Sequence, residues 1–319
     1  SVAPDVQGNE GNDWPQFHGP RRDNRSTETG LLKHWPPDGP PRVWTARGLG
    51  HGFATVAISG DAIYTSGDRD GKTIVTALDR RSGRIRWQVE NGKAWEASQP
   101  GSRSTPTIDG DRLYHENAHG NVVCLDAKTG RQLWAVNLLD EFHAKNIHWG
   151  LSESVLIDGD RAICSPGGPE AAMVALDKHT GRLVWKSASA GDSAGYASAS
   201  LAEYQGLRML FTLTSRAAIG VNADSGELLW RFEQVTPYDE TIGMPIYHDG
   251  HVLVSTRTAG TVMLKLHVDG KKASVREVWA TVVRPELVET FRGELDVFQE
   301  DLAAAEPCEP DPEEAADYP

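Results

Sequence analysis

Apolar and polar residues alternate in short runs along most of the chain, and each run ends at a glycine-containing turn. Between residues 104 and 136, four such runs follow one another: STPTID, RLYHE, NVVCLD and RQLWAV. Period-two alternation predicts strands, and the Asp-Gly, His-Gly and Thr-Gly steps between runs supply the positive φ of tight hairpin turns. A matching series, SESVLID, RAICS, AMVALD and RLVWK, follows between residues 152 and 186. Each series predicts a four-stranded antiparallel meander.

One eleven-residue stretch recurs four times along the chain, each time ending in tryptophan: ALDRRSGRIRW, CLDAKTGRQLW, ALDKHTGRLVW and GVNADSGELLW. A degenerate fifth copy also ends in tryptophan, and successive tryptophans are 47, 51, 45 and 49 residues apart. Four-stranded units at this period predict an all-β propeller, whose sheets (blades) pack face to face around a central channel. We expect the tryptophans to dock on the neighbouring blade, where each indole can bury ~150–250 Å². The docking residues are Trp87, Trp134, Trp185, Trp230 and Trp279.

The consensus A-L-D-x-x-T-G-x-x-x-W resembles the repeat of the pyrroloquinoline-quinone (PQQ)-like β-propellers. That family includes quinoprotein alcohol dehydrogenases and the lipoprotein propeller of the bacterial outer-membrane assembly machinery. The stretch 13–44 also resembles the leader of exported bacterial members, and the whole resemblance covers roughly residues 13–280. It implies an eight-bladed ring in a periplasmic or otherwise exported protein, whereas five complete blades can be counted here.

The chain divides by pattern into four segments. We expect a leader over residues 1–40 that packs on the propeller, blades over 41–280, an amphipathic helix over 281–305 and a disordered acidic tail over 306–319. The helix is predicted by one apolar stripe: Leu287, Phe291, Leu295, Phe298 and Leu302. A helix that docks on the last blade and an end altered by truncation or a changed reading frame both fit this pattern.

Charge and hydropathy exclude two classes of partner. Residues 285–319 hold twelve acidic residues and one basic residue, so only −2 of the net charge of −13 belongs to the rest of the chain. A nearly neutral body predicts no nucleic-acid surface. No run approaches 18 apolar residues, which predicts no membrane span. The chain begins at Ser1 without a signal peptide, which is expected of a processed protein or a trimmed fragment.

Cysteine and histidine spacing predicts no metal site. Cys124 and Cys164 lie in apolar runs and are expected to be buried thiols without a disulfide. His115, His119, His143 and His148 are interpreted as solvated loop residues rather than metal ligands.

Candidate binding residues precede the first strand of each blade, because the loops that enter these strands crowd one face of a propeller. These loops are HGFAT, GSRSTP, HWGLSES, AGYASAS and TIGMP, in which small residues are interrupted by one large group. We expect a ligand site at the channel mouth, and packing inside the channel is the alternative role for the aromatic side chains. The candidate ligand-binding residues are Arg103, Ser104, Trp149, Glu153, Tyr196 and Met244.

Two classes of function are compatible with the resemblance. The first is a non-catalytic binding or scaffold module that holds a protein or a small-molecule ligand on its loop face, with no catalytic residue and no cofactor. The alternative is a PQQ-dependent alcohol or sugar oxidoreductase with calcium. Family enzymes stack the quinone between a tryptophan and a disulfide of two adjacent cysteines, and this chain has no Cys-Cys pair. Glu153 is a carboxylate without the Asn and Asp that would complete a calcium site. We therefore favour the binding module.

Ring closure can also be predicted from the sequence. A propeller ring closes when an N-terminal strand joins the last blade as its outer strand, and PRVWTA at 41–46 suits that role. Five blades shaped for an eight-bladed ring predict an open arc with exposed strand edges. The alternative is a tightened ring of five or six blades that the N-terminal strand closes.

Overall fold

The computed structural model describes residues 13–30, 32–34, 36–37, 39–236 and 239–281. The chain divides into two compact units, Ser1–Ala280 and Thr281–Pro319, and the fold described below is that of the first. The helix predicted over 281–305 and the tail predicted over 306–319 lie outside the described residues, apart from Thr281.

Five antiparallel sheets of four strands each form this unit, and every sheet is a meander in chain order. The first two sheets are β1 (Ala57–Ser59), β2 (Ala62–Arg69), β3 (Lys72–Asp79) and β4 (Ile85–Lys93), then β5 (Thr107–Asp109), β6 (Arg112–Glu116), β7 (Asn121–Asp126) and β8 (Gln132–Asn137). The third is β9 (Leu156–Asp158), β10 (Arg161–Cys164), β11 (Val174–Asp177) and β12 (Leu183–Lys186). The last two are β13 (Ser200–Tyr204), β14 (Leu207–Leu213), β15 (Ala217–Asn222) and β16 (Leu228–Glu233), then β17 (Ile246–His248), β18 (His251–Thr256), β19 (Gly260–Asp269) and β20 (Lys272–Thr281).

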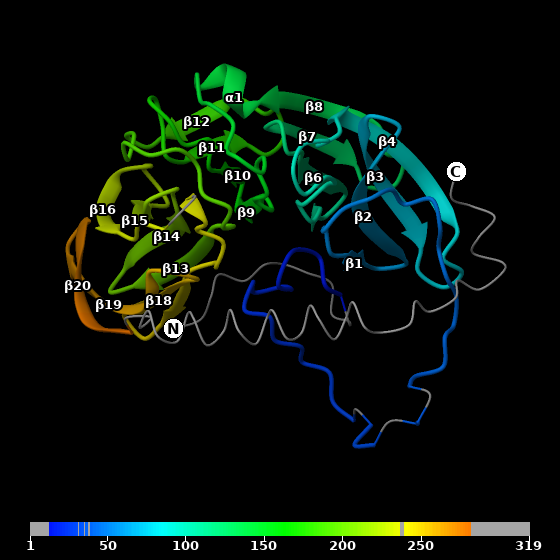
Figure 1. Cartoon of the computed structure of the whole chain (residues 1–319), viewed down its shortest axis with the longest axis horizontal. Coiled ribbons are helices and arrows are strands. Elements are labelled where there is room, and N and C mark those ends of the chain that lie inside the picture. Colours follow the sequence, from blue (N-terminus) through cyan, green and yellow to red (C-terminus); the bar gives the residue numbers. More distant parts are fainter. Residues whose placement is uncertain (1–12, 31, 35, 38, 237–238, 282–319) are drawn as a thin grey trace, which may run out of the picture. The chain divides into compact units, whose positions relative to one another are not determined.

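The sheets follow one another as blades, with the first strand of each innermost and the fourth strand outermost (Figure 1). One short helix, α1 (Leu138–Glu141), follows β8 and is capped by Asn137, whose side chain accepts the Asp140 N–H. In the described part of the chain, no helix has the length and apolarity needed to cross a membrane. The predicted all-β architecture of four-stranded blades is therefore confirmed.

The recurring D-x-x-T-G stretch is a side-chain-capped hairpin turn. In the second blade, one carboxylate oxygen of Asp126 accepts the backbone N–H groups of Lys128 and Thr129 and the Thr129 hydroxyl. Gly130 then takes φ +74°, a left-handed conformation that favours glycine. Asp79 and Asp177 make the same bonds in the first and third blades.

The tryptophan that recurs at the end of the repeat in one blade docks on this turn in the next blade. The Trp87 indole N–H donates to the Ala127 carbonyl at 3.1 Å, and that of Trp134 donates to the Lys178 carbonyl at 2.9 Å. The same bond joins Trp185 to Ala223 at 3.2 Å. The turn glycine lies against the indole face, since a Cβ added to Gly181 would stand 2.9 Å from Trp134. Each indole therefore joins two blades by a hydrogen bond and a large apolar contact.

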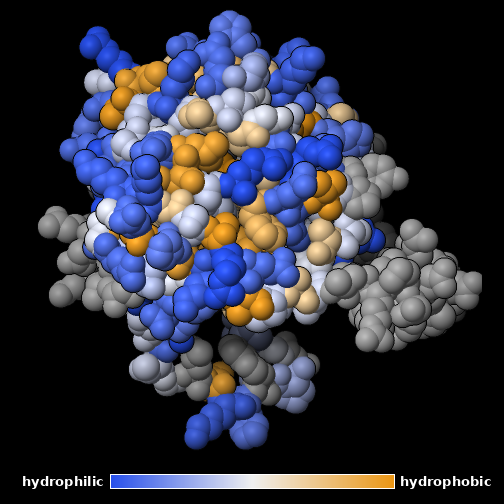
Figure 2. All heavy atoms as spheres, turned by 90° about the vertical axis from the view of Figure 1, so that its left-hand side faces the viewer, coloured by the Kyte–Doolittle hydropathy of each residue, from blue (hydrophilic) through white to orange (hydrophobic). Residues whose placement is uncertain are grey.

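The docking pattern changes at the fifth blade. Its third and fourth strands are joined by a two-residue hairpin at Gly270 and Lys271 instead of the five-residue turn. The Trp230 indole N–H is buried without a hydrogen-bond partner among the described residues, and its ring packs 5.8 Å from Phe211. Trp279 lies two residues before the end of β20, and its side chain is exposed instead of docked on a described blade. On the side of the unit that carries β20, apolar residues form patches among polar ones (Figure 2).

The N-terminal strand does not close a ring. Residues 41–46 form no strand, and within the described ranges no backbone hydrogen bond joins them to β17–β20. Instead, Trp44 docks on the first blade as the later tryptophans dock on theirs, with its indole N–H 3.2 Å from the Arg80 carbonyl. The strand proposed for 41–46 is thus wrong, whereas the absence of ring closure by this segment agrees with an open arc.

A second series of contacts joins the blades near the centre. The Thr55 N–H donates to the Thr105 hydroxyl at 3.1 Å, the Thr105 N–H to the Ser154 hydroxyl at 3.0 Å, and the Ser154 N–H to the Ser198 hydroxyl at 2.9 Å. These residues precede the first strand of successive blades by the same two positions. These backbone N–H groups lie outside the sheets and have no partner strand. Hydroxyl groups of the next blade accept their hydrogen bonds instead.

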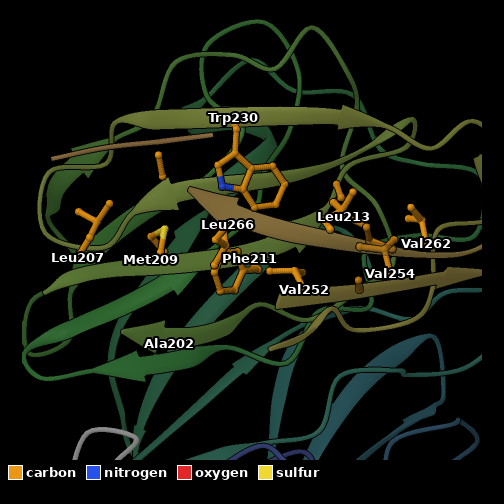
Figure 3. Packing of buried hydrophobic residues seen from close by; sticks show 14 residues of the cluster. Ala202, Leu207, Met209, Phe211, Leu213, Trp230, Val252, Val254, Val262 and Leu266 are labelled. Atoms are coloured by element: carbon orange, nitrogen blue, oxygen red, sulfur yellow. The ribbon is translucent and has the colours of Figure 1, made fainter. Parts of the chain in front are cut away.

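Apolar cores lie between adjacent blades. Between the fourth and fifth blades, Met209, Phe211 and Leu213 of β14 face Val252 and Val254 of β18 (Figure 3). Alternate residues of each strand enter these cores, as a half-buried sheet requires. Each pair of neighbouring blades is therefore held together by its own layer of buried apolar side chains, and the described residues form four such layers instead of one continuous core.

The leader crosses the inner strands of three blades. Trp14 exchanges two backbone hydrogen bonds with Ile58, and the Pro15 carbonyl accepts the Ile108 N–H at 2.7 Å. The Arg22 guanidinium then donates to the Ser154 and Val155 carbonyls at 2.8 and 3.1 Å. This segment therefore ties the first, second and third blades together.

Replacement of Gly181 by alanine tests the docking contact. Gly159→Ala is the matched control, because Gly159 also has positive φ (+57°) in the third blade but has nothing within 4 Å of an added Cβ. Both variants incur a left-handed backbone cost of about 1–2 kcal/mol. Gly181→Ala additionally displaces the Trp134 ring, and overpacking costs typically about 1–3 kcal/mol. We expect the Tm to fall clearly further in Gly181→Ala. Equal Tm values for the two variants would show that the indole contact carries no stability.

Candidate functional site

Equivalent residues from successive blades gather where the chain enters the first strands. Phe53 and Arg103 stand four positions before β1 and β5, and two residues before the central hydroxyls of Thr55 and Thr105. Tyr196 and Ile242 hold the same position before β13 and β17. Backbone bonds join the loops here, from the Phe53 N–H to the Ser102 carbonyl and from the Tyr196 N–H to the Thr241 carbonyl. We call the side chains of Phe53, Arg103, Tyr196 and Ile242 the mouth cluster.

Arg103 lies between two aromatic rings. Its guanidinium carbon is 5.6 Å from the Phe53 ring centroid and 5.7 Å from that of Trp95, which suits cation–π contacts. Two of its nitrogens donate to the backbone carbonyls of Gly101 and Gln99. Partial burial lowers the pKa of Arg103, and the nearby Asp68 opposes that shift. Across the described residues no carboxylate pairs with it within 4 Å, so the mouth cluster presents a cation on an aromatic support.

Trp149 and Tyr196 form a second aromatic pair. Their ring centroids are 5.6 Å apart, and the Trp149 N–H donates to the Tyr196 hydroxyl at 3.3 Å. Arg103 is close enough to Tyr196 to lower its pKa, against the larger raising effect of burial. The structure therefore brings Arg103, Trp149 and Tyr196 into one neighbourhood.

Ser104 and Glu153 lie in the interior of the unit and are not part of the mouth cluster. Both are buried, and Glu153 Oε1 has no hydrogen-bond partner in the described structure. Burial raises the pKa of Glu153 to about 7, while Ser165 and Arg22 favour its ionised form. Glu116 is buried beside it, and burial together with the Glu153 charge raises the pKa of Glu116 well above its usual range. These carboxyl groups form a buried acid pair.

Met244 occupies the position of the central hydroxyls in the fifth blade. It stands two residues before β17, as Ser198 stands before β13, and its half-buried thioether is a much weaker hydrogen-bond acceptor than a hydroxyl. The ring contacts and hydrogen bonds of Arg103 and Trp149 in the described part of the chain do not include Met244. Its place in the binding site stays a prediction.

Several residues of the site were missed from the sequence. Trp95 lies in the loop after β4 and is not one of the tryptophans that recur at the blade period, so the repeat does not point to it. Arg22 is fully buried although it sits in a polar leader stretch, PRRD. The interpretation of His115 as a solvated residue is wrong, because it is fully buried in β6 with its Nδ1 2.8 Å from Asn91 Nδ2, and burial lowers its pKa to about 3.

The residues present do not fit a quinone with calcium in the manner of the family enzymes. Cys124 and Cys164 are free, buried thiols on different blades, so these two cysteines do not form the disulfide that flanks the quinone in the family enzymes. Glu153 is buried, its pKa is raised to about 7 so that it is only partly ionised around pH 7, and the Arg22 cation lies beside it. A divalent cation prefers exposed, ionised carboxylates and several further oxygens. Groups of three or more His, Cys, Asp or Glu that could hold a metal do not occur among the described residues.

Two hollows accompany these residues. One of about 370 Å³ lies beside the mouth cluster and is lined by His51, Asp68, Trp95 and Gly101 among others. A larger hollow of about 520 Å³ lies at the other end of the inner strands, between the leader and the turns that follow β5 and β9. The candidate residues Arg103 and Trp149 do not line the larger one.

Comparison with known proteins connects the chain to one family. A family model described as outer membrane protein assembly factor BamB matches residues 71–283. Quinoprotein ethanol dehydrogenase of Pseudomonas putida is 32% identical over 108 residues, which are 32% of this chain and 17% of that protein. The BamB of Burkholderia pseudomallei is 24% identical over 200 residues, which are 52% of this chain and 50% of that protein.

Solved structures show the same fold. The crystal structure of BamB from Moraxella catarrhalis matches with a TM-score of 0.54 at 19% identity, over 75% of this chain and 64% of that one. The chain thus spans half or less of the curated relatives it matches, and under two thirds of this solved structure.

The buried acid pair makes stability depend on pH. Burial raises the pKa of Glu153 to about 7 in the folded chain, whereas its ordinary value is 4.5. The stability that the protonated Glu153 contributes to the fold is therefore fully present below pH 4.5 and is lost as the pH rises through about 7. Glu153→Gln keeps a neutral side chain at every pH. We expect this variant to gain Tm relative to the parent between pH 5 and pH 8, with little difference at pH 4.5. Glu227→Gln, at an exposed carboxyl, is the control. A Tm difference that does not change with pH would contradict the buried acid.

Proposed function

The chain belongs to the PQQ-like β-propeller family that the BamB model describes, and from this premise we propose that it is a non-catalytic binding or scaffold module. The surface that binds is the loop face that carries the mouth cluster. The partner is a protein, and a small-molecule ligand in the hollow beside Trp95 is the narrower alternative. The relatives named BamB support a periplasmic, exported location.

The observation that carries this proposal is the exposure of apolar side chains around a cation. Phe53 is 57% exposed and Ile242 is 63% exposed, although both precede the innermost strands. Arg103 and the Trp149–Tyr196 pair lie among these loops. Aromatic residues and arginine are the side chains that most often dominate protein interfaces. Apolar side chains that are exposed together and rimmed by polar groups are a feature of interaction sites.

Site-specific crosslinking tests the binding face. A photoreactive phenylalanine analogue at Phe53 or Ile242 should give one discrete adduct in the native cells, because a partner that covers the loop face shields these positions. The controls are Leu183 and Val184 on the outer strand β12, which are 46% and 50% exposed and should give none. Adducts only at the outer strand, or none at all four positions, would rule out the loop face as the binding surface.

The competing function is a quinone-dependent oxidoreductase. The similarity to quinoprotein ethanol dehydrogenase, which extends over 108 residues, favours this function. Titration of the chain with PQQ and Ca²⁺, followed by absorbance and by dye-linked alcohol oxidation, separates the two functions. We expect neither saturable stoichiometric binding nor turnover, because the buried Glu153 and the separate cysteines do not supply the quinone site. Tight binding of PQQ together with turnover would contradict the binding module and show that the chain is an enzyme.

A further inference from the structure

The larger hollow, of about 520 Å³, is a second site distinct from the mouth cluster. Its walls come from the leader, from the β5–β6 and β9–β10 turns, and from Lys178 after β11. Arg103 precedes β5 whereas Asp111 follows it, so the two sites lie at opposite ends of the same inner strand. The volume is within the range of about 300–1,000 Å³ that small-molecule sites occupy.

One side of this hollow holds a buried cation whose charge is not fully compensated. Arg22 lines the hollow, is fully buried, and donates to two backbone carbonyls and to Gln16 Oε1. Its Nε has no partner in the described part of the chain. Burial lowers the pKa of Arg22 to about 10, and the acid that opposes this shift is Glu153, whose own pKa is raised by burial to about 7, so that it compensates the Arg22 charge only in part around pH 7. An anion beside Arg22 would therefore be stabilised.

The turns that border the hollow supply the opposite charge. Asp111 and Asp160 line it with side chains that are 91% and 82% exposed, and their contacts to Arg112 and Lys178 are long, at 3.8 and 3.6 Å, which leaves most of each carboxylate open to a ligand. Asp158 also lines it, with a buried Oδ2 that lacks a hydrogen-bond partner within the described residues. Four acidic and four basic side chains line the hollow in total, with histidine taken as neutral: Asp109, Asp111, Asp158, Asp160, Arg21, Arg22, Arg112 and Lys178. Such a balanced lining favours a ligand that has both charges and no net charge.

We propose that this hollow binds a small zwitterion, namely an amino acid or short peptide with both termini free. The ligand carboxylate lies toward Arg22, and its ammonium group lies toward Asp111 and Asp160. Charge-assisted hydrogen bonds at both ends would then select free termini over blocked ones. This site is independent of the binding face proposed above.

Calorimetric titration with trialanine tests the proposal on the full chain. Trialanine with free termini should bind with one-to-one stoichiometry, and N-acetyl-trialanine and trialanine amide should each bind about tenfold or more weakly, as loss of one hydrogen bond to a charged group predicts. Binding should also raise the Tm of the chain.

Substitutions identify which end of the ligand each side chain meets. Asp160→Asn should weaken trialanine binding, and so reduce its preference over the N-acetyl peptide, and should not weaken binding of the N-acetyl peptide. Asp61→Asn is the matched control, because Asp61 holds the same turn position in the first blade, is exposed, and does not line the hollow. Arg22→Gln should remove the difference in affinity between trialanine and trialanine amide. Circular dichroism establishes whether that leader variant is folded, and the Asp160 comparison decides the proposal independently.

Equal affinity for free and blocked peptides would overturn the proposal. So would a full preference for free termini in Asp160→Asn, or the absence of binding by any of the three peptides at millimolar concentration. Loss of affinity in Asp61→Asn equal to that in Asp160→Asn would place the effect outside the hollow.

Discussion

The contact between a tryptophan and the turn of the following blade is the interaction on which the rest of the structure depends. Each blade alone is a small sheet with two faces to cover, and only its neighbours can cover them. The indole sets the register of two neighbours, because its N–H reaches one carbonyl and its ring needs one glycine, as at Trp134, Lys178 and Gly181. Repetition of the motif therefore specifies the spacing of the blades as well as their number.

The same dependence explains the two ends of the described propeller. Trp44 makes the docking contact on the first blade although the residues around it form no strand. At the fifth blade the turn has been replaced by a tight hairpin, and the Trp230 N–H finds no partner among the described residues. Loss of one turn thus removes one hydrogen bond, and aromatic packing of Trp230, Phe211 and Tyr247 joins the last two blades instead.

The centre of the unit obeys a different constraint. Backbone groups at the entry to each first strand cannot be satisfied by a sheet, and hydroxyls from the next blade and the leader arginine bind them. This polar interior leaves Glu116, Glu153 and Arg22 away from water. Aromatic and apolar side chains occupy the loop end of the inner strands, while charged turns and the leader enclose a hollow at the other end. One scaffold therefore presents two chemically different surfaces.

The sequence by itself determined the all-β class, the four-stranded blades and their period, because strand alternation, the Asp side-chain turn and the docking tryptophan are local signals that recur. It also placed Arg103, Trp149 and Tyr196 in loops that enter the inner strands. Only the tertiary structure decided that Trp95 and Phe53 flank Arg103, that Glu153 and His115 are buried, and that Arg22 crosses from the leader to the third blade. These contacts join residues up to about 130 positions apart, and no short-range pattern encodes which side chains meet when separate blades pack together.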